Sequence, residues 1–445
     1  SKPSFLVITG KRRVGKTELI KQFTQNRPSL YLFVDSNKSI EILMDEYDRL
    51  TRDKLSLPDY IKLDEPEKFL QFITSYDQDI VIAIDEFQRF LKIHPSFITQ
   101  LQKYWDMKPD SCRIFLIISG SSIGMIKKIF IQAQAPLFKR ADNILTLKPF
   151  TSSEIFKMLD DMGITDREDK LNLYFLFGGT VYYYCLLDKY QCTGFQDALE
   201  KLVFNEFAPL RNEVRDILIE EFGKKHSTSY EIISAIAQGK CSMSEISELT
   251  HVSTNSLSAY LYDLIHLLEV VEYRTPVLDN PKKSKRGRYF LKDNFFRFYG
   301  RFIYPMSSQY AAGKYQSLTE RVLLEWQSYT GKIFEDMVRE SIQDTMGQEY
   351  PDIGNWWNRK GNEIDILGVN QGEGKGLAVE IKNRDLNEQQ ARDILRDMSQ
   401  KTRQIKGFAS MEVQYGIVAR NIEGRQNLEH EGIYVWEMAD ILLHV

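Results

Sequence analysis

Residues 5–17 constrain the fold of this chain more than any other stretch. The apolar run FLVIT leads directly into GKRRVGKT and then into the helical pattern ELIKQF. Gly10 and Gly15 let the backbone curl so that several N–H groups point at one phosphate group, and the following helix adds its positive N-terminal end. A strand, loop and helix in this order predict a parallel α/β sheet that binds a nucleoside triphosphate.

The same loop supplies most of the predicted ligands of the nucleotide. The Lys16 ammonium is expected to reach the β- and γ-phosphates, and the Thr17 hydroxyl is expected to ligate Mg²⁺. The predicted cofactors are therefore ATP and Mg²⁺. The complete set of predicted nucleotide-binding residues is Gly10, Arg13, Val14, Gly15, Lys16, Thr17, Glu18 and Ser119.

A second buried strand is expected to complete the nucleotide site. Residues 79–87, DIVIAIDEF, form a continuous apolar run that ends in two carboxylates, as a central parallel strand requires. Asp85 is predicted to hold Mg²⁺ through water, and Glu86 to polarise the attacking water. An Asp-Glu pair at a strand end is a weak signal alone, but here it follows a phosphate loop.

Two further residues are candidates for contact with the γ-phosphate. An apolar strand at residues 113–119 ends in SGSS, where the Ser119 hydroxyl is expected to sense that phosphate. Arg140, in PLFKR, precedes one more expected strand at residues 143–147 and is a candidate arginine finger. An unpaired surface arginine is the alternative interpretation of Arg140.

The length, charge and cysteine content of the chain limit the classes of protein to which it can belong. A chain of 445 residues is long enough for about three domains. Its net charge of −4 gives no general attraction to DNA or membranes, so any DNA affinity must come from local patches. No apolar run approaches a membrane span, and the four scattered cysteines predict reduced thiols, so we expect a cytoplasmic protein. We also expect a segment upstream of Ser1 to be missing.

Turn and capping residues, together with the periodicity of apolar residues, divide the chain into four expected parts. Residues 1–150 alternate apolar strands with helical patterns and predict the ATPase core, a three-layer parallel sheet. Residues 151–222 open with the capping box TSSE and predict a helical lid. Residues 223–310 contain three short amphipathic helices and two strands, the plan of a winged helix. Residues 311–445 begin with helices and continue as an α/β domain.

The C-terminal part holds a second group of chemically useful residues. Asp365 lies on an alternating strand, and the next strand carries Glu380 and Lys382 on one face because side chains alternate with a period of two. Two carboxylates suit Mg²⁺ or Mn²⁺, and a lysine can stabilise phosphate charge, so this set predicts a magnesium nuclease. Glu335 on the preceding helix is a candidate third carboxylate. By spacing alone, an exposed strand of alternating charges is an equally good interpretation.

These motifs together resemble a family of prokaryotic, chiefly archaeal, P-loop ATPases of the AAA/STAND-like superfamily. The stretch GKRRVGKTELI looks like the phosphate loop of that family, and IDEFQ looks like its second ATPase motif. The residues around Glu335, Asp365 and Glu380 resemble its C-terminal part. The resemblance implies a winged helix followed by a domain of the restriction-nuclease fold, PD-(D/E)XK. Two departures, the absence of proline after Gly179 and Ile381 in place of cysteine, touch no predicted ligand.

DNA is the predicted macromolecular partner, but the expected recognition helix supports it weakly. Residues 254–268 contain no Lys or Arg, and only Asn255 offers base contacts. The expected wing is different, because residues 282–288, KKSKRGR, carry five positive charges. A solvated loop is the alternative interpretation of this run. The pair Trp356 and Trp357 is expected to pack under the C-terminal sheet rather than to stack on bases.

Three classes of function remain open from the sequence. The first is an ATPase that gates metal-dependent DNA cleavage, with Lys16, Glu86 and Arg140 at one site and Asp365, Glu380 and Lys382 at the other. The second is an ATP-dependent switch whose C-terminal domain binds DNA or protein without cutting. The third is a DNA-loading motor. A homo-oligomer is compatible with all three.

Overall fold

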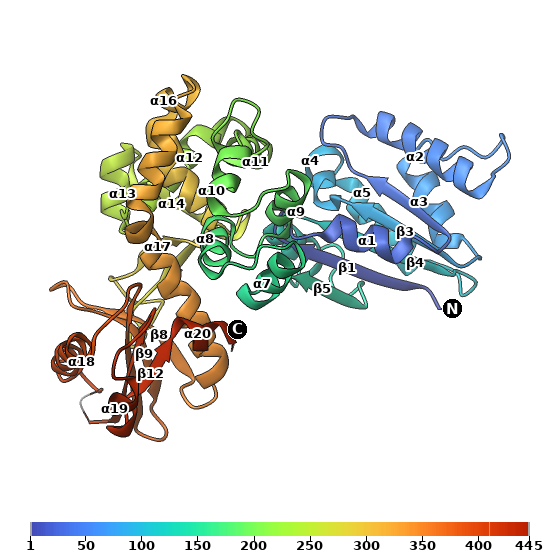
Figure 1. Cartoon of the computed structure of the whole chain (residues 1–445). Helices are drawn as coiled ribbons and strands as arrows, with labels where there is room; N and C mark the ends of the chain where they lie inside the picture. The colour runs from blue at the N-terminus through green and yellow to red at the C-terminus, as the bar shows by residue number, and fades with distance from the viewer. Residues whose placement is uncertain (1, 409, 444–445) are drawn as a thin grey trace. The chain divides into compact units, whose positions relative to one another are not determined.

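The computed structural model describes residues 2–408 and 410–443, which fall into two compact units (Figure 1). Unit 1 contains the chain up to Pro149 together with Thr180–Tyr182 and Tyr262–Glu269. Unit 2 contains Phe150–Gly179, Tyr183–Leu261 and the chain from Val270 onward. Among the described residues, no helix has the length and apolar character that a membrane crossing needs.

Unit 1 is built on a five-stranded parallel sheet. Its strands are β1 (Ser4–Gly10), β2 (Ser29–Phe33), β3 (Ile80–Asp85), β4 (Ile114–Gly120) and β5 (Asn143–Leu147). They lie in the order β2-β3-β4-β1-β5, and every neighbouring pair is parallel. All carboxyl ends therefore meet at one edge of the sheet. The predicted α/β class is confirmed.

Helices cover both faces of this sheet, because the side chains of each buried strand alternate between two hydrophobic clusters. The cluster on one face contains Phe5 and Val7 of β1 with residues of α2 (Ile40–Leu55), α3 (Pro66–Ser75), α5 (Ser96–Asp106) and α6 (Ile123–Phe130). The cluster on the other face joins Ile8 of β1 to Ile20 of α1 (Lys16–Thr24). The short α4 (Phe90–Ile93) follows β3. The result is the expected three-layer arrangement.

The first half of unit 2 is helical and ends in a hairpin. It contains α7 (Ser152–Asp161), α8 (Arg167–Phe177), α9 (Val181–Lys189), α10 (Phe195–Ala198) and α11 (Glu213–Phe222). Then come α12 (His226–Ala237), α13 (Met243–Thr250) and α14 (Thr254–His266). The first two residues of α9 and the end of α14 from Tyr262 onward belong to unit 1. The antiparallel strands β6 (Val271–Arg274) and β7 (Arg288–Leu291) close this half. The elements lie within a few residues of the expected positions.

The second half of unit 2 carries a mixed five-stranded sheet. After α15 (Asn294–Phe298), α16 (Ser307–Ala311) and the long α17 (Tyr315–Met346), the sheet has the order β12-β11-β10-β9-β8. Its strands are β8 (Asp352–Trp357), β9 (Glu363–Asn370), β10 (Lys375–Lys382), β11 (Glu412–Ala419) and β12 (Tyr434–Glu437). Three helices complete this half: α18 (Glu388–Thr402), α19 (Arg425–His430) and α20 (Met438–Leu443).

A buried carboxylate on α17 ties the hairpin to the C-terminal sheet. Asp336 accepts hydrogen bonds from Arg274 of β6 at 2.7 Å, Arg297 of α15 at 3.1 Å and Arg339 of its own helix at 2.8 Å. Burial opposes ionisation, but the three guanidinium charges hold the pKa of Asp336 well below its usual range. Since breaking a buried ion pair is strongly destabilising, this cluster fixes the elements that meet around α17.

Candidate nucleotide site and candidate carboxylate site

The phosphate loop lies between the end of β1 and the start of α1, at the carboxyl edge of the parallel sheet. Gly10 has a φ of +154°, and a Cβ there would lie 2.5 Å from the carbonyl oxygen of Leu147. Only glycine therefore fits where the loop leaves β1. The Lys16 ammonium donates to the carbonyl oxygens of Gly10 and Lys11, each at 2.9 Å, and Lys16 is 6% exposed.

The Asp85 carboxylate lies beside this loop and accepts hydrogen bonds on both oxygens. The Thr17 hydroxyl and the Tyr31 hydroxyl each donate to Oδ2 at 2.7 Å. The Ser119 hydroxyl and the Glu86 backbone N–H donate to Oδ1. Hard oxygen donors from Thr17 and Asp85 thus meet at the end of the phosphate loop, and this donor set fits Mg²⁺ bound with a triphosphate.

Glu86 follows Asp85 in the left-handed backbone region, with a φ of +58°, which turns its side chain away from the strand. Its carboxylate accepts hydrogen bonds from Gln88 at 2.5 Å and Ser121 at 2.8 Å, and the Arg89 Nε lies 3.7 Å away. Because a non-glycine residue in this region is uncommon, the conformation of Glu86 is set by these surroundings. The carboxylate is therefore fixed beside Asp85 at the end of β3.

The other predicted nucleotide ligands lie in different surroundings, and their roles stay predictions. Ser119 is fully buried and its hydroxyl donates to Asp85, so it orients that carboxylate. Ser121, two residues later, donates to Glu86 instead. The Arg13 guanidinium stacks on the ring of Tyr182 at 3.9 Å. Val14 is buried, and the exposed Glu18 lies in the first turn of α1.

Arg140 lies at the opposite edge of the same sheet. Its guanidinium pairs with Asp106 at 3.0 and 3.3 Å, and it comes just before Asp142, which accepts from the backbone N–H of Phe5. Five residues of strand, about 17 Å, separate Phe5 from Gly10 of the phosphate loop. Arg140 therefore lies away from the phosphate loop of its own unit, and its role as an arginine finger stays a prediction.

Tyr31 is the residue of this site that the sequence interpretation missed. It lies on β2, where β2 pairs with β3, and burial together with the Asp85 charge raises the pKa of its hydroxyl. A tyrosine in an apolar strand carries no signal of such a contact, because its partner is more than fifty residues away. The register of β2 on β3, with Leu32 opposite Ile84, brings the two side chains to the same edge.

We expect Tyr31→Phe to weaken the magnesium dependence of ATP hydrolysis without unfolding unit 1. Loss of one hydrogen bond to a buried charged group should raise the Mg²⁺ concentration needed for half-maximal rate about tenfold. Thermal unfolding and the rate at saturating Mg²⁺ separate this positioning role from a purely structural one. An unchanged Mg²⁺ requirement would contradict it.

In unit 2, Asp365, Glu380 and Lys382 come together where β9 pairs with β10. The Lys382 ammonium lies 3.0 Å from the Glu380 carboxylate and 3.7 Å from that of Asp365. The Ile381 backbone N–H donates to Asp365 at 2.8 Å, and Lys401 of α18 lies 3.4 Å from Glu380. The three predicted residues therefore form one cluster.

The two carboxylates of this cluster have opposite pKa shifts. Burial, followed by the charges of Glu380 and Glu335, raises the pKa of Asp365 well above its usual value. Burial also acts on Glu380, but its hydrogen bond with Asp365 and the Lys382 charge lower its pKa. Opposite pKa shifts in two neighbouring carboxylates are often found at catalytic and metal-binding sites.

Glu335 does not complete a three-carboxylate site. It pairs with Lys332 one turn earlier on α17. Within residues 2–408 and 410–443, no three or more His, Cys, Asp or Glu side chains are grouped closely enough to hold a metal ion. Asp365, Glu380 and Lys382 instead line a cavity of about 440 Å³ together with Asp393 and Lys401.

The loop between β6 and β7 is attached to the C-terminal sheet. Arg286 pairs with Asp279 of the same loop and donates to the carbonyl oxygen of Trp357 at 2.9 Å, and Arg288 pairs with Glu363. Two of the five predicted DNA-contacting cations are therefore engaged within unit 2. Lys282, Lys283 and Lys285 are exposed, and the tryptophans Trp356 and Trp357 are buried as expected.

Comparisons with known proteins agree with the geometry of unit 1. The family described as an ATPase domain predominantly from Archaea matches residues 1–187, and a family of archaeal and bacterial proteins of unknown function matches residues 299–394. An uncharacterized protein of Methanocaldococcus jannaschii is 30% identical over 428 residues, which cover 95% of this chain and 92% of that protein.

One solved structure agrees with this chain at the level of the fold. The Walker-type ATPase PABY2304 of Pyrococcus abyssi is 16% identical, with a TM-score of 0.51 over 67% of this chain and 90% of that one. The Aeropyrum pernix ORC2 protein, solved with ADPNP and ADP, has a TM-score of 0.44 and 12% identity over 69% of this chain and 88% of its own.

The parallel sheet, the phosphate loop and the adjacent carboxylates define a P-loop ATPase of the archaeal type. The chain belongs to the same family as the Methanocaldococcus protein, which it matches over nearly the whole of both sequences.

Proposed function

We propose that unit 1 hydrolyses ATP at the carboxyl edge of its sheet, with Asp85 and Glu86 in separate roles. Lys16 binds the phosphates, Thr17 and Asp85 hold Mg²⁺, and Glu86 orients and deprotonates the attacking water. Bound Mg²⁺ supplies neutralisation of the charge on the β- and γ-phosphates. The observation that carries this proposal is the direct contact of Thr17 with Asp85, beside the fixed carboxylate of Glu86.

Lys16→Ala tests this proposal through nucleotide binding. The substitution removes the buried ammonium next to the loop carbonyls, so we expect affinity for ATP to fall at least tenfold. Titration calorimetry with ATP and Mg²⁺ measures the change. Lys21→Ala, on the same helix, is the matched control and should bind ATP like the wild type.

For unit 2, we propose metal-dependent cleavage of DNA by Asp365, Glu380 and Lys382. The convergence of these three residues on neighbouring strands favours this function. Mg²⁺ is commonly held by one or two carboxylates together with substrate phosphates, so a two-carboxylate site suffices. Bound metal would activate water and neutralise phosphate charge, while Lys382 stabilises the negative charge that develops on the phosphate. Binding without cleavage is the alternative, in which ATP acts only as a switch.

The helices α12–α14 and the hairpin β6–β7 serve, in this proposal, as a winged helix that contacts DNA. The stripe Leu257, Leu261 and Leu264 is buried, so α14 presents its polar side outward without Lys or Arg. DNA contact therefore falls to the exposed cations of the β6–β7 loop, which can meet phosphates but read no sequence.

We expect replacement of Lys282, Lys283 and Lys285 by Ser to weaken DNA binding equally for all sequences. Each lost phosphate contact should reduce the slope of log affinity against log salt by about 0.9, giving a total of about two to three. Arg286 is left intact because its pairing with Asp279 is structural. The matched control replaces the exposed Lys54, Lys62 and Lys92 by Ser, and an unchanged salt slope for the loop variant would rule out this contact.

A further inference from the structure

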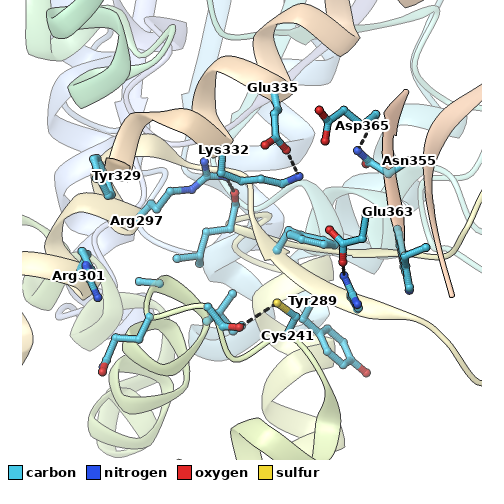
Figure 2. A pocket seen from close by; sticks show the side chains of 18 of the residues that line it. Cys241, Tyr289, Arg297, Arg301, Tyr329, Lys332, Glu335, Asn355, Glu363 and Asp365 are labelled. Carbon is cyan, nitrogen blue, oxygen red and sulfur yellow. Dashed lines mark hydrogen bonds and ion pairs between the residues drawn. The ribbon is translucent and has the colours of Figure 1, made fainter. Parts of the chain in front are cut away.

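A second cavity of unit 2, larger than the one beside the carboxylates, has a volume of about 560 Å³ (Figure 2). It is enclosed by the end of α12, by β7 and α15, by α17 and by the edge of β8 and β9. Small-molecule sites commonly have volumes of about 300 to 1,000 Å³, so the volume of this cavity lies within the usual range. The cavity can therefore accept one or two nucleotides but no duplex.

Two buried polar atoms of residues that line it have no hydrogen-bond partner within residues 2–408 and 410–443. They are the Nη1 of Arg297, a residue that is 8% exposed, and the hydroxyl of Tyr329. Nη2 of Arg297 donates to the carbonyl oxygen of Leu291 and to the Asp336 carboxylate, so the guanidinium group, with its Nη1, is held in place. Because buried donors in folded proteins are nearly always paired, these two predict a ligand that supplies acceptor oxygens.

The rest of the wall suits an anionic ligand with a flat ring. Figure 2 shows Arg297, Arg301, Lys332 and Tyr329 around the same space. Lys332 is paired with Glu335 and Arg301 with Glu325, so an incoming phosphate would share these cations with carboxylates. Such cations bind phosphate oxygens through charge-assisted hydrogen bonds. The half-buried aromatic residues Tyr289 and Phe290 form another part of the lining, and bases stack on such side chains. Phosphate and base are the two components of a nucleotide.

Asp365 lines both this cavity and the 440 Å³ cavity that contains Glu380 and Lys382. A strand whose terminal nucleotides occupy the larger cavity would thus present its next phosphodiester to the carboxylates. We propose that this cavity binds one or two unpaired nucleotides and restricts the carboxylate site to single-stranded or frayed ends. The proposal rests on the cleavage function proposed for unit 2. Unpaired bases are favoured because paired ones must first be unstacked at a cost.

Ser328→Trp tests the proposal by filling the mouth of the cavity. Ser328 is exposed on α17, lines the cavity and makes only a hydrogen bond to Glu325 within its own helix, so the indole should not disturb the fold. Ser317→Trp is the matched control, because Ser317 is exposed on the same helix with the equivalent bond to Lys314. Tyr329→Phe removes only the unpaired hydroxyl.

Binding is measured by fluorescence anisotropy in EDTA, with every protein carrying Lys16→Ala, so that neither cleavage nor the phosphate loop contributes. The probes are a labelled single-stranded 12-mer, the same sequence as a blunt duplex, and unlabelled deoxyadenosine monophosphate as competitor. We expect Ser328→Trp to weaken 12-mer binding at least tenfold and Tyr329→Phe about tenfold, with Ser317→Trp unchanged. Single strand should bind more tightly than duplex.

The outcomes separate the source of the ligand and the fate of each proposal. An unlabelled 12-mer serves as a second competitor. If the mononucleotide displaces the probe at the same concentration as this 12-mer, the ligand is a free nucleotide. If it needs a much higher concentration, the ligand is a strand end. Equal binding by wild type and Ser328→Trp, or tighter duplex binding, would overturn the proposal. DNA binding is measured without free metal and therefore does not depend on cleavage. If the cavity variants weaken binding as expected but DNA stays intact in a separate assay with Mg²⁺, only the nuclease function is rejected.

Discussion

ATP hydrolysis by Glu86→Gln is expected to be about a hundredfold slower than that of the wild type, with ATP still bound. An amide accepts no proton from water, so the variant loses general-base catalysis, which typically contributes a factor of about 10² to 10⁴. The shape of the side chain and the hydrogen bond from Ser121 are preserved, since the remaining carbonyl oxygen can accept it. The phosphate loop, Thr17 and Asp85 are untouched, so affinity should change little.

Single-turnover hydrolysis and equilibrium binding of ATP measure the two effects separately. Glu67→Gln is the matched control, because Glu67 is an exposed residue of α3 in the same unit. Wild-type hydrolysis by Glu86→Gln would assign the base to another residue. A loss of ATP binding in the same variant would show that Glu86 supports the loop rather than the water.

Asp365→Asn is expected to remove Mg²⁺-dependent DNA cleavage and to leave ATP hydrolysis at the wild-type rate. The amide cannot supply the anionic oxygen that a hard cation prefers, and the two sites lie in different units. The fall in cleavage should be about a hundredfold or more, as for loss of other groups that stabilise transition-state charge. The measurement follows labelled single-stranded and duplex DNA with Mg²⁺ or Mn²⁺, with and without ATP.

Asp352→Asn, on β8 of the same sheet, is the matched control for this experiment, since Asp352 is exposed. Lys382→Ala should match Asp365→Asn in cleavage. If all variants and the wild type leave every DNA intact while the ATPase is active, unit 2 acts by binding alone, and ATP controls that binding.

Unit 1 was predictable because its signals are local and continuous. The runs that become β1 and β3 are apolar along their whole length, as buried parallel strands are, and each ends at the residues that carry chemistry. The phosphate loop fixes where α1 begins. In unit 2, the capping box at Thr151 likewise starts α7 where it was expected.

Contacts over long sequence separations were not predictable from the same patterns. Ser119 and Ser121 differ only by two positions, yet the sheet buries one against Asp85 and leaves the other to Glu86. Arg286 belongs to a run of cations that suggests contact with solvent or phosphate. It instead pairs with the half-buried Asp279 and donates to the carbonyl oxygen of Trp357. Such pairings depend on tertiary structure rather than on local composition.

The placement of β8 and Arg140 shows the same limit. Residues 352–357 contain glycine and two tryptophans and were not expected to form a strand, but they pair antiparallel with β9 and pack Trp356 into the C-terminal core. Arg140 precedes a strand, as expected, and the parallel topology then places it away from the phosphate loop because strand starts and strand ends lie at opposite edges.

The most direct test of ATP hydrolysis at the phosphate loop is to measure phosphate release from ATP by the purified chain. Wild type and Lys16→Ala are compared at saturating ATP, each with Mg²⁺ and with EDTA. We expect steady phosphate release from the wild type in Mg²⁺ alone and none above background from Lys16→Ala. Equal release by both proteins, or release that persists in EDTA, would contradict the assignment of ATP hydrolysis to the phosphate loop, Thr17 and Asp85.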